Sequence, residues 1–235
     1  MKNTESDRRH SPFLPRITPW LFALGLTLAA STSQAISFRA DFVSSTYQVG
    51  AGDTFSDLLI QHQSGALIQT NVTTGLENIS TAVYAGGVTQ NYSLLLSTTL
   101  EVGVAGTYTF QVGTDWGRGG AAALIDNSNG SIVSERVITD DVWWANNWNN
   151  PDVFTTTFDF AAGDSYTLQW VGFEDCCGGS TTLRFSVDGS GFMPLTETSL
   201  EPYALVPEPG TAILIGVGLG GLAWPTLRRR SVASR

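Results

Sequence analysis

Basic residues are scarce in the central part of this chain. Between residues 36 and 206 the sequence contains eighteen acidic residues, four arginines and no lysine, which gives a formal net charge of −14. Proteins that bind nucleic acids or anionic membrane surfaces present a basic face to them. The composition therefore argues against nucleic acid as a partner and is typical of a soluble extracellular protein, in which spare carboxylates are candidate calcium ligands.

Histidine and the common catalytic motifs are scarce as well. The chain has two histidines, His10 and His62, and it lacks both the G-x-S-x-G and the H-E-x-x-H patterns. We therefore expect no enzymatic activity. A polysaccharide hydrolase is the weakest alternative, in which paired carboxylates would supply the acid and the base. Its candidate residues are Glu174 and Asp175, set against Asp126 or Asp141.

Pronounced apolar runs occur near the two ends of the chain. Near the N-terminus, Arg8, Arg9 and Arg16 precede an apolar stretch from Trp20 to Ala30, and small residues follow at Ser33-Gln34-Ala35. This order is typical of a secretory signal peptide that is cleaved after Ala35. We therefore predict a signal peptide over residues 1–35.

The C-terminal end combines three features in a fixed order. Pro207-Glu208-Pro209 is followed by an apolar stretch over residues 211–227 and then by Arg228-Arg229-Arg230. The two prolines favour extended backbone, which a processing enzyme can reach. The apolar stretch is shorter than the ~20 residues of an ordinary membrane-spanning helix, and the arginines should stay cytoplasmic. An anchor that is never cut is the alternative.

This C-terminal arrangement resembles the PEP-CTERM sorting signal of Gram-negative bacteria. The resemblance covers residues 207–235 and implies processing by the membrane enzyme exosortase after transient membrane insertion through the C-terminal helix. Together with the action of signal peptidase, it implies an exported protein of the cell surface or extracellular matrix. Residues 197–206 would form a spacer between the folded body and this signal.

The body between the two signals has the sequence pattern of an all-β domain. Segments rich in Thr, Val, Tyr and Phe recur between Gly, Asp and Asn residues. We predict an antiparallel β-sandwich or jelly roll over residues 36–196. Its clearest strands are Ser37–Gln48, Tyr92–Val102, Gly106–Val112, Ala121–Asp126, Ile132–Ile138, Val153–Phe160, Ser165–Phe173 and Thr181–Val187. Residues 53–63 could hold a short helix capped by Asp53 or Thr54, and residues 64–81 a loop.

Part of the body resembles PA14-type domains. The residues that carry the resemblance are Gly106–Gly117, Ala162–Leu168, Phe173-Glu174 and Thr182–Ser186. PA14-like domains are β-sandwiches, and several bind carbohydrate through calcium that adjacent aspartates hold. Trp116 replaces the second aspartate of that pair here, so the resemblance leaves Asp115, with Asp126 as a substitute partner, as candidate calcium ligands.

The only two cysteines are adjacent, at Cys176 and Cys177, and Gly178-Gly179 follows them. An exported location favours oxidation, so we predict a disulfide bond between these neighbours. Free thiols and an intermolecular bridge are alternatives, and a metal site lacks the usual set of ligands. The motif resembles a subset of PEP-CTERM proteins defined by CCxG. A closed ring would present a flat, apolar platform.

Tryptophan and asparagine are concentrated in residues 140–152. Indole faces stack on the C–H surfaces of sugars, and asparagine side chains both donate to and accept from hydroxyls. We therefore predict a sugar-binding surface, with candidate residues Trp143, Trp144, Asn147, Trp148 and, from the PA14-like segment, Trp116. The alternative is that one or two of these rings plug the end of the sandwich as core.

The leading hypothesis from sequence is an exported, non-catalytic protein that binds a glycan. PEP-CTERM systems accompany exopolysaccharide and biofilm matrix, so the resemblance implies extracellular polysaccharide as the partner. The second hypothesis is a structural surface or biofilm-matrix protein without a defined ligand.

Overall fold

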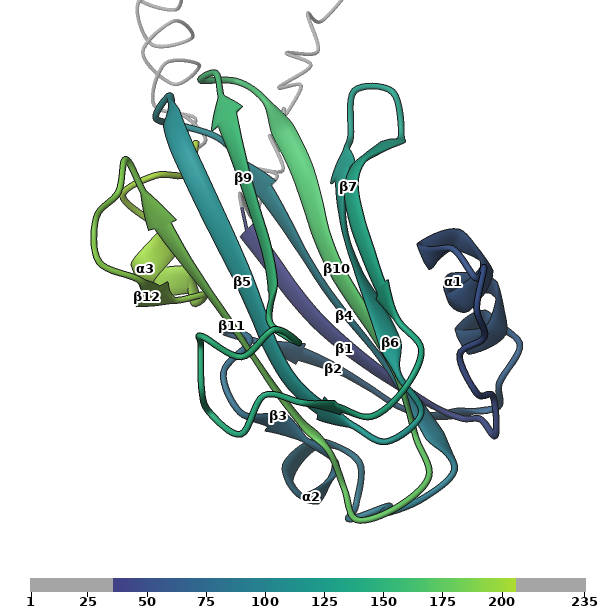
Figure 1. The fold of residues 1–235 in the computed structure, drawn as a ribbon. Helices are drawn as coiled ribbons and strands as arrows, with labels where there is room; N and C mark the ends of the chain where they lie inside the picture. The colour runs from purple at the N-terminus through teal and green to yellow at the C-terminus, as the bar shows by residue number, and fades with distance from the viewer. Residues whose placement is uncertain (1–35, 206–235) are drawn as a thin grey trace, which may run out of the picture. The chain divides into compact units, whose positions relative to one another are not determined.

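Two antiparallel sheets form the body of the protein (Figure 1). The computed structural model describes residues 36–205, and the predicted signal peptide and the Pro-Glu-Pro signal lie outside these residues. The predicted C-terminal membrane helix also lies outside them. Among the described residues, no helix has the length and apolar character needed to cross a membrane.

The first sheet has six strands, and its hydrogen-bonded order mixes distant parts of the chain. The order is β2 (Leu67–Thr73), β1 (Ile36–Ser44), β4 (Tyr92–Glu101), β10 (Ser165–Glu174), β6 (Gly120–Asp126) and β7 (Ser131–Ile138). The second sheet contains β12 (Met193–Pro194), β11 (Ser180–Val187), β5 (Gly106–Trp116) and β8 (Val142–Trp143). In addition, β3 (Ile79–Ser80) pairs with β11, and β9 (Phe154–Phe160) pairs with β5.

The core between the sheets follows from alternation along the strands. In β5, Tyr108, Phe110 and Val112 are buried, whereas Thr109 and Gln111 between them are only half-buried. Burying each large apolar side chain contributes about 1.5–3 kcal/mol relative to exposure. The predicted strand over Gly106–Val112 is therefore confirmed, and it continues to Trp116.

A helix covers the outer face of the first sheet. The helix α1 (Phe55–Gln63) begins with a capping box, in which Thr54 and Asp57 exchange hydrogen bonds. Phe55 and Leu58 pack in one buried cluster with Val171 of β10 and with β6. The helix expected within residues 53–63 is confirmed, with Thr54 as its cap.

The region predicted as a loop over residues 64–81 is ordered into strands, so that prediction is wrong. It contains β2 and β3, and the short helix α2 (Thr81–Tyr84) follows directly. β2 is an edge strand, and Leu67 and Val72 on it are 66% and 78% exposed. Because little of this strand is buried, its sequence carries no clear apolar alternation.

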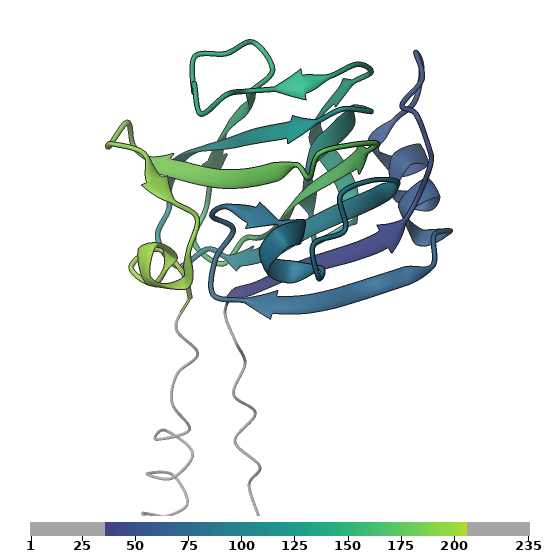
Figure 2. The ribbon, with the colours of Figure 1, turned by 90° about the horizontal axis from the view of Figure 1, so that it is seen from below.

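The predicted spacer is also corrected. Residues 197–205 pack onto the sandwich through the helix α3 (Glu197–Leu200), and Leu200 and Ala204 are buried. Ala204 forms a β-bridge with Val102, and the ring of Tyr203 lies edge-on to Phe185 in the core. The folded body therefore extends to Leu205 instead of ending at residue 196. Figure 2 shows α3 beside the second sheet.

Candidate functional site

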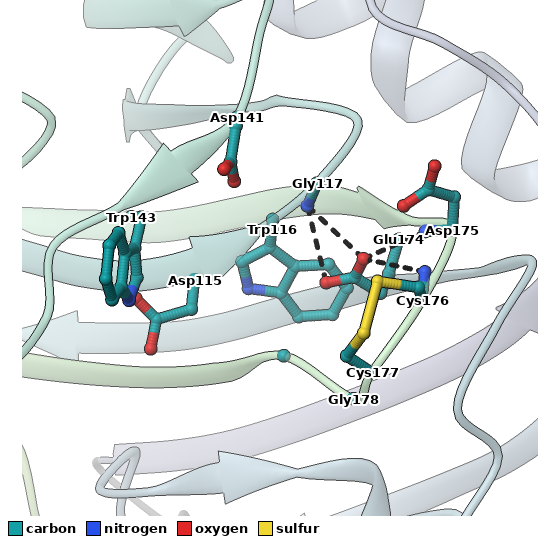
Figure 3. A pocket seen from close by; sticks show the side chains of 11 residues that line it. Asp115, Trp116, Gly117, Asp141, Trp143, Glu174, Asp175, Cys176, Cys177 and Gly178 are labelled. Carbon is teal, nitrogen blue, oxygen red and sulfur yellow. Dashed lines mark hydrogen bonds between the residues drawn. A yellow bond between two sulfur atoms is a disulfide. The ribbon is translucent and has the colours of Figure 1, made fainter.

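An open pocket of about 490 Å³ lies where β5 ends and where β10 turns into β11. Three segments line it, and Figure 3 shows their side chains. They are Asp115–Gly117 at the end of β5, Glu174–Gly179 in the turn between β10 and β11, and Asp141 with Trp143 from the tryptophan-rich loop. The three regions singled out in the sequence, which are the PA14-like segment, the cysteine turn and the tryptophan-rich loop, therefore meet at one site.

A short strand pairing brings the tryptophan-rich loop to this pocket. Asp115 of β5 lies opposite Trp143 of β8, and Trp116 lies opposite Val142. Residues that face each other in an antiparallel pair have Cβ atoms about 4.5–5.5 Å apart, so their side chains can act together. Figure 3 shows the Asp115 carboxylate beside the Trp143 ring. Trp143 is 61% exposed, which makes it the aromatic surface that a ligand can reach.

Trp116 has a different role from the one predicted. Its side chain is 1% exposed, and its indole Nε1 donates a hydrogen bond of 2.8 Å to Thr181 Oγ1. The Tyr92 ring packs against it edge to face at 5.3 Å. Trp116 therefore forms the buried floor beneath the pocket, and the prediction that it stacks on a sugar is wrong.

Trp144 and Trp148 also lie away from the pocket. Trp144 is buried over the backbone of Gly113 in the second sheet, and its ring contacts that of Trp148 at 4.3 Å between centroids. The guanidinium of Arg184 lies 3.8 Å from the centroid of Trp148 and 4.3 Å from that of Phe192. These rings form a stack on the sheet, so the alternative of a structural plug holds for them.

Asn147 is exposed, but it does not line the pocket. Its side-chain Oδ1 accepts a hydrogen bond of 3.1 Å from the backbone N–H of Asn149, and its backbone N–H donates to the carbonyl of Trp144. These bonds shape the loop locally. Of the predicted sugar-binding residues, Trp143 alone offers an exposed ring to the pocket.

The pocket is strongly acidic. Four carboxylates line it, those of Asp115, Asp141, Glu174 and Asp175. Among the described residues that line or flank it, the one ion pair joins Arg118 to Asp175 at 3.9 Å. Sequence reasoning named Asp141, Glu174 and Asp175 only as weak candidates for hydrolysis, because no sequence motif shows that they gather around Asp115.

Glu174 is the most buried of these carboxylates, at 4% exposure. It accepts hydrogen bonds from the backbone N–H groups of Asp175 at 2.9 Å, Cys176 at 3.1 Å and Gly117 at 3.3 Å. Burial raises its pKa although these hydrogen bonds act in the opposite direction. Glu174 thus ties the end of β5 to the cysteine turn, and Figure 3 draws these bonds.

Asp115 is held at the edge of the second sheet. Burial raises the pKa of its carboxyl, hydrogen bonds from Ala145 N–H and Ser180 Oγ lower it, and the charge of Asp141 raises it. The two hydrogen bonds are long, at 3.4 and 3.5 Å. Its oxygens are therefore weakly engaged and available to a hydroxyl or a cation.

Asp126 does not lie in this pocket. It ends β6 at the turn into β7, where its carboxylate accepts hydrogen bonds from Ser128 N–H and Asn129 Nδ2. The pocket lies toward the Gly120 end of that strand, roughly 20 Å away at ~3.3 Å per residue. The prediction that Asp115 and Asp126 share a calcium ion is therefore wrong.

The residues that could hold a cation lie around the cysteine turn instead. Ligand atoms of Glu174, Asp175 and Cys176 lie within 4.8 Å of one another. Cys176 is bonded to Cys177, so it offers no thiolate. Carboxylate oxygens are the ligands that calcium prefers. The donor set is therefore Glu174 and Asp175, with Asp115 and Asp141 on the other side of the pocket.

The predicted disulfide between Cys176 and Cys177 is confirmed. Both cysteines are exposed, and Cys177 has φ 75°, a left-handed conformation that is uncommon for a residue with a Cβ atom. Gly178 follows with φ 76°, and Gly179 N–H donates to the Tyr92 hydroxyl at 2.9 Å. The turn thus presents its two sulfur atoms on the pocket wall that faces Trp143 and Asp115 (Figure 3).

Among known proteins, the similarities to this chain are similarities of fold to solved structures. No family model matches the sequence, and a search of curated proteins finds no match. Among solved structures, the chain is similar to a PA14 sugar-binding domain from an RTX adhesin, with 12% identity, a TM-score of 0.45, and coverage of 73% of this chain and 98% of that one.

Two further structures show the same level of similarity. One is the A domain of epithelial adhesin 6 from Candida glabrata in complex with Galβ1-3GlcNAc, at 12% identity and a TM-score of 0.47, covering 73% of this chain and 87% of that one. The other is the PA14 domain of the antifreeze protein MpAFP, at 17% identity and a TM-score of 0.43, covering 72% and 92%.

Proposed function

We propose that the body of this protein binds a glycan in the pocket between Trp143 and the Cys176–Cys177 turn. The observation that carries the proposal is the exposed indole of Trp143, held opposite Asp115 at an open pocket. A sugar ring presents C–H groups on its faces and hydroxyls at its edge. The indole can stack on the C–H faces of the sugar, and a carboxylate can accept hydrogen bonds from its hydroxyls.

The other walls of the pocket support the same ligand class. The disulfide adds a small apolar surface across from Trp143, and Asp141, Glu174 and Asp175 add acceptors. A volume of about 490 Å³ lies within the range of small-molecule sites. We therefore expect one or two sugar residues to occupy the pocket while the rest of the glycan extends into solvent.

Calcium is the candidate cofactor of this site. The four carboxylates match its preference for oxygen ligands, and the ion would offset their mutual repulsion and offer free coordination positions to sugar hydroxyls. Asp115, Asp141, Glu174 and Asp175 are the residues that would hold it. In this proposal Asp141, Glu174 and Asp175 replace Asp126 as the predicted partners of Asp115.

The terminal sequences extend the proposal to location. We propose that signal peptidase and exosortase process the chain, with transient insertion through the C-terminal helix, and that it reaches the cell surface or matrix of a Gram-negative bacterium. The motifs that support this are Ser33-Gln34-Ala35, Pro207-Glu208-Pro209 and Arg228-Arg229-Arg230. The proposed ligand would then be extracellular polysaccharide.

The test is binding of the exported protein to a glycan array and to matrix exopolysaccharide, with calcium and with chelator. Retention that the chelator abolishes supports the calcium-dependent form of the proposal. Retention that survives chelation supports binding through Trp143 and the cysteine turn without the ion. Release of reducing ends would indicate a hydrolase, and no retention under either condition would leave a structural surface protein.

A further inference from the structure

We propose that the Cys176–Cys177 disulfide makes the glycan pocket sensitive to thiols, so that its reduction loosens one wall and weakens binding. The inference rests on the function proposed above, because it concerns the same pocket. It differs from that function in assigning the disulfide a regulatory role. Three features of the turn carry it: its backbone conformation, its contacts with the carboxylates, and its exposure.

The backbone of the turn depends on the ring that the disulfide closes. Cys177 has φ 75° and Gly178 has φ 76°, so two consecutive residues are left-handed. Glycine adopts this conformation freely, but for cysteine it brings Cβ close to the backbone carbonyl. The bond between neighbouring side chains restricts the conformations open to Cys177. Once the bond is broken, Cys177 can return to negative φ, and the turn then changes its path.

The same turn holds the ligand-facing carboxylates in place. Cys176 N–H donates to Glu174 at 3.1 Å, and Gly179 N–H donates to the Tyr92 hydroxyl at 2.9 Å. Gly179 packs so closely on the backbone carbonyl of Asp115 that a Cβ there would collide with it. A change of path between Cys176 and Gly179 therefore displaces Glu174 and Asp115 together.

The disulfide is open to attack by a reductant. Cys176 and Cys177 are both exposed, as are Asp175 and Gly178 on either side. Trp116 and Tyr92 beneath the turn are buried and keep the floor of the pocket fixed. Reduction is thus expected to act on the wall of the pocket and to leave the sandwich itself folded.

The reaction is ordinary thiol–disulfide exchange with a dithiol. A thiolate of the dithiol attacks one cysteine sulfur, forms a mixed disulfide, and releases the other cysteine as a thiolate that takes up a proton. The second thiol of the dithiol then attacks the mixed disulfide and becomes part of a new ring. Two electrons pass to the protein, which ends with two thiols, and the dithiol ends as a cyclic disulfide.

The experiment compares oxidised and dithiothreitol-reduced forms of the exported protein. Retention on the glycan array should weaken about tenfold or more on reduction, which corresponds to ~1.4 kcal/mol, and reoxidation should restore it. Amide hydrogen exchange should become faster at Cys176 and Gly179 in the reduced form. Equal retention in both forms would overturn the inference and leave the proposed function standing.

Two variants separate the backbone from the sulfur atoms. Cys176→Ser with Cys177→Ser should bind as weakly as the reduced protein and should not respond to dithiothreitol. Cys176→Ser with Cys177→Gly allows left-handed backbone without the disulfide, so it should recover part of the affinity. The mechanism would be contradicted if this second variant recovered no affinity and if reduction of the wild type left amide hydrogen exchange at Cys176 and Gly179 unchanged. No retention by the oxidised protein would instead reject the proposed function, and the inference with it.

Discussion

Trp143 and Trp144 show how one step along the chain changes the role of a residue. Successive side chains of an extended segment point in opposite directions, so Trp143 reaches the pocket and is 61% exposed, while Trp144 is 3% exposed over Gly113. Trp148 then joins Trp144, away from the pocket. A cluster of tryptophans in the sequence therefore divides into one binding candidate and a structural pair.

The structural pair leads to a prediction about stability. Trp148→Ala removes the ring contact with Trp144 and the cation–π contact with Arg184, so it should lower the free energy of unfolding by about 2–3 kcal/mol. Trp143→Ala is the matched change at an exposed position and should cost about 0.5 kcal/mol or less. Chemical denaturation of both variants measures this, and equal losses would contradict the division of roles.

Gly179 gives a second prediction at the residue scale. A methyl group there would collide with the Asp115 carbonyl and approach Glu174, so Gly179→Ala should lower stability by roughly 1–3 kcal/mol and disturb the pocket. Gly191 has open space around its Cα atom and serves as the control. Thermal unfolding should show a lower melting temperature for Gly179→Ala only. A neutral Gly179→Ala would mean that the turn is not packed as described.

At the scale of elements, most of the long strands could be predicted, whereas the edge strand β2 and the two-residue strands could not. Thr107–Val112 carries the alternation of a half-buried strand, and Thr54 carries a capping signal. β2 has little buried surface and so leaves no pattern, and β8 has only two residues. The pocket depends on the pairing of β8 with β5, so sequence reasoning found Trp143 and Asp115 without showing that they face each other.

The packing of α1 on the first sheet gives a prediction about pH. His62 on this helix is 3% exposed, its Nδ1 lies 2.8 Å from Ser93 Oγ, and burial lowers its pKa to about 4. The unfolded chain therefore binds a proton more readily than the folded one between pH 6.5 and 4. Stability from this group is complete above pH 6.5 and falls as the pH drops toward 4, by on the order of 3 kcal/mol.

The test of this pH dependence is thermal unfolding of the wild type and of His62→Gln across that pH range. Part of the acid destabilisation should be absent in the variant, because glutamine does not titrate. The comparison isolates His62 because the two proteins share all other titrating groups. Among these, burial raises the pKa of Glu174, so its contribution to stability falls as the pH rises, opposite to that of His62. Identical pH profiles for the two proteins would show that His62 is not buried in its neutral form.

At the scale of the whole molecule, the charge of the body argues against one class of partner, the polyanions. Eighteen acidic residues and four arginines leave no basic face for a polyanion. The protein should therefore show no binding to duplex DNA in a mobility-shift assay, even at low salt, where such binding is strongest. A salt-sensitive shift would contradict the inference that the body presents no basic face.

The most direct test of the account is glycan binding by Trp143→Ala, with Phe192→Ala as the control. Phe192 is 40% exposed and packs on Arg184 away from the pocket, so its removal tests for a general effect of losing a surface ring. The account predicts that Trp143→Ala loses retention on the array while keeping the wild-type melting temperature, and that Phe192→Ala retains binding. Full retention by Trp143→Ala would contradict the pocket as the glycan site.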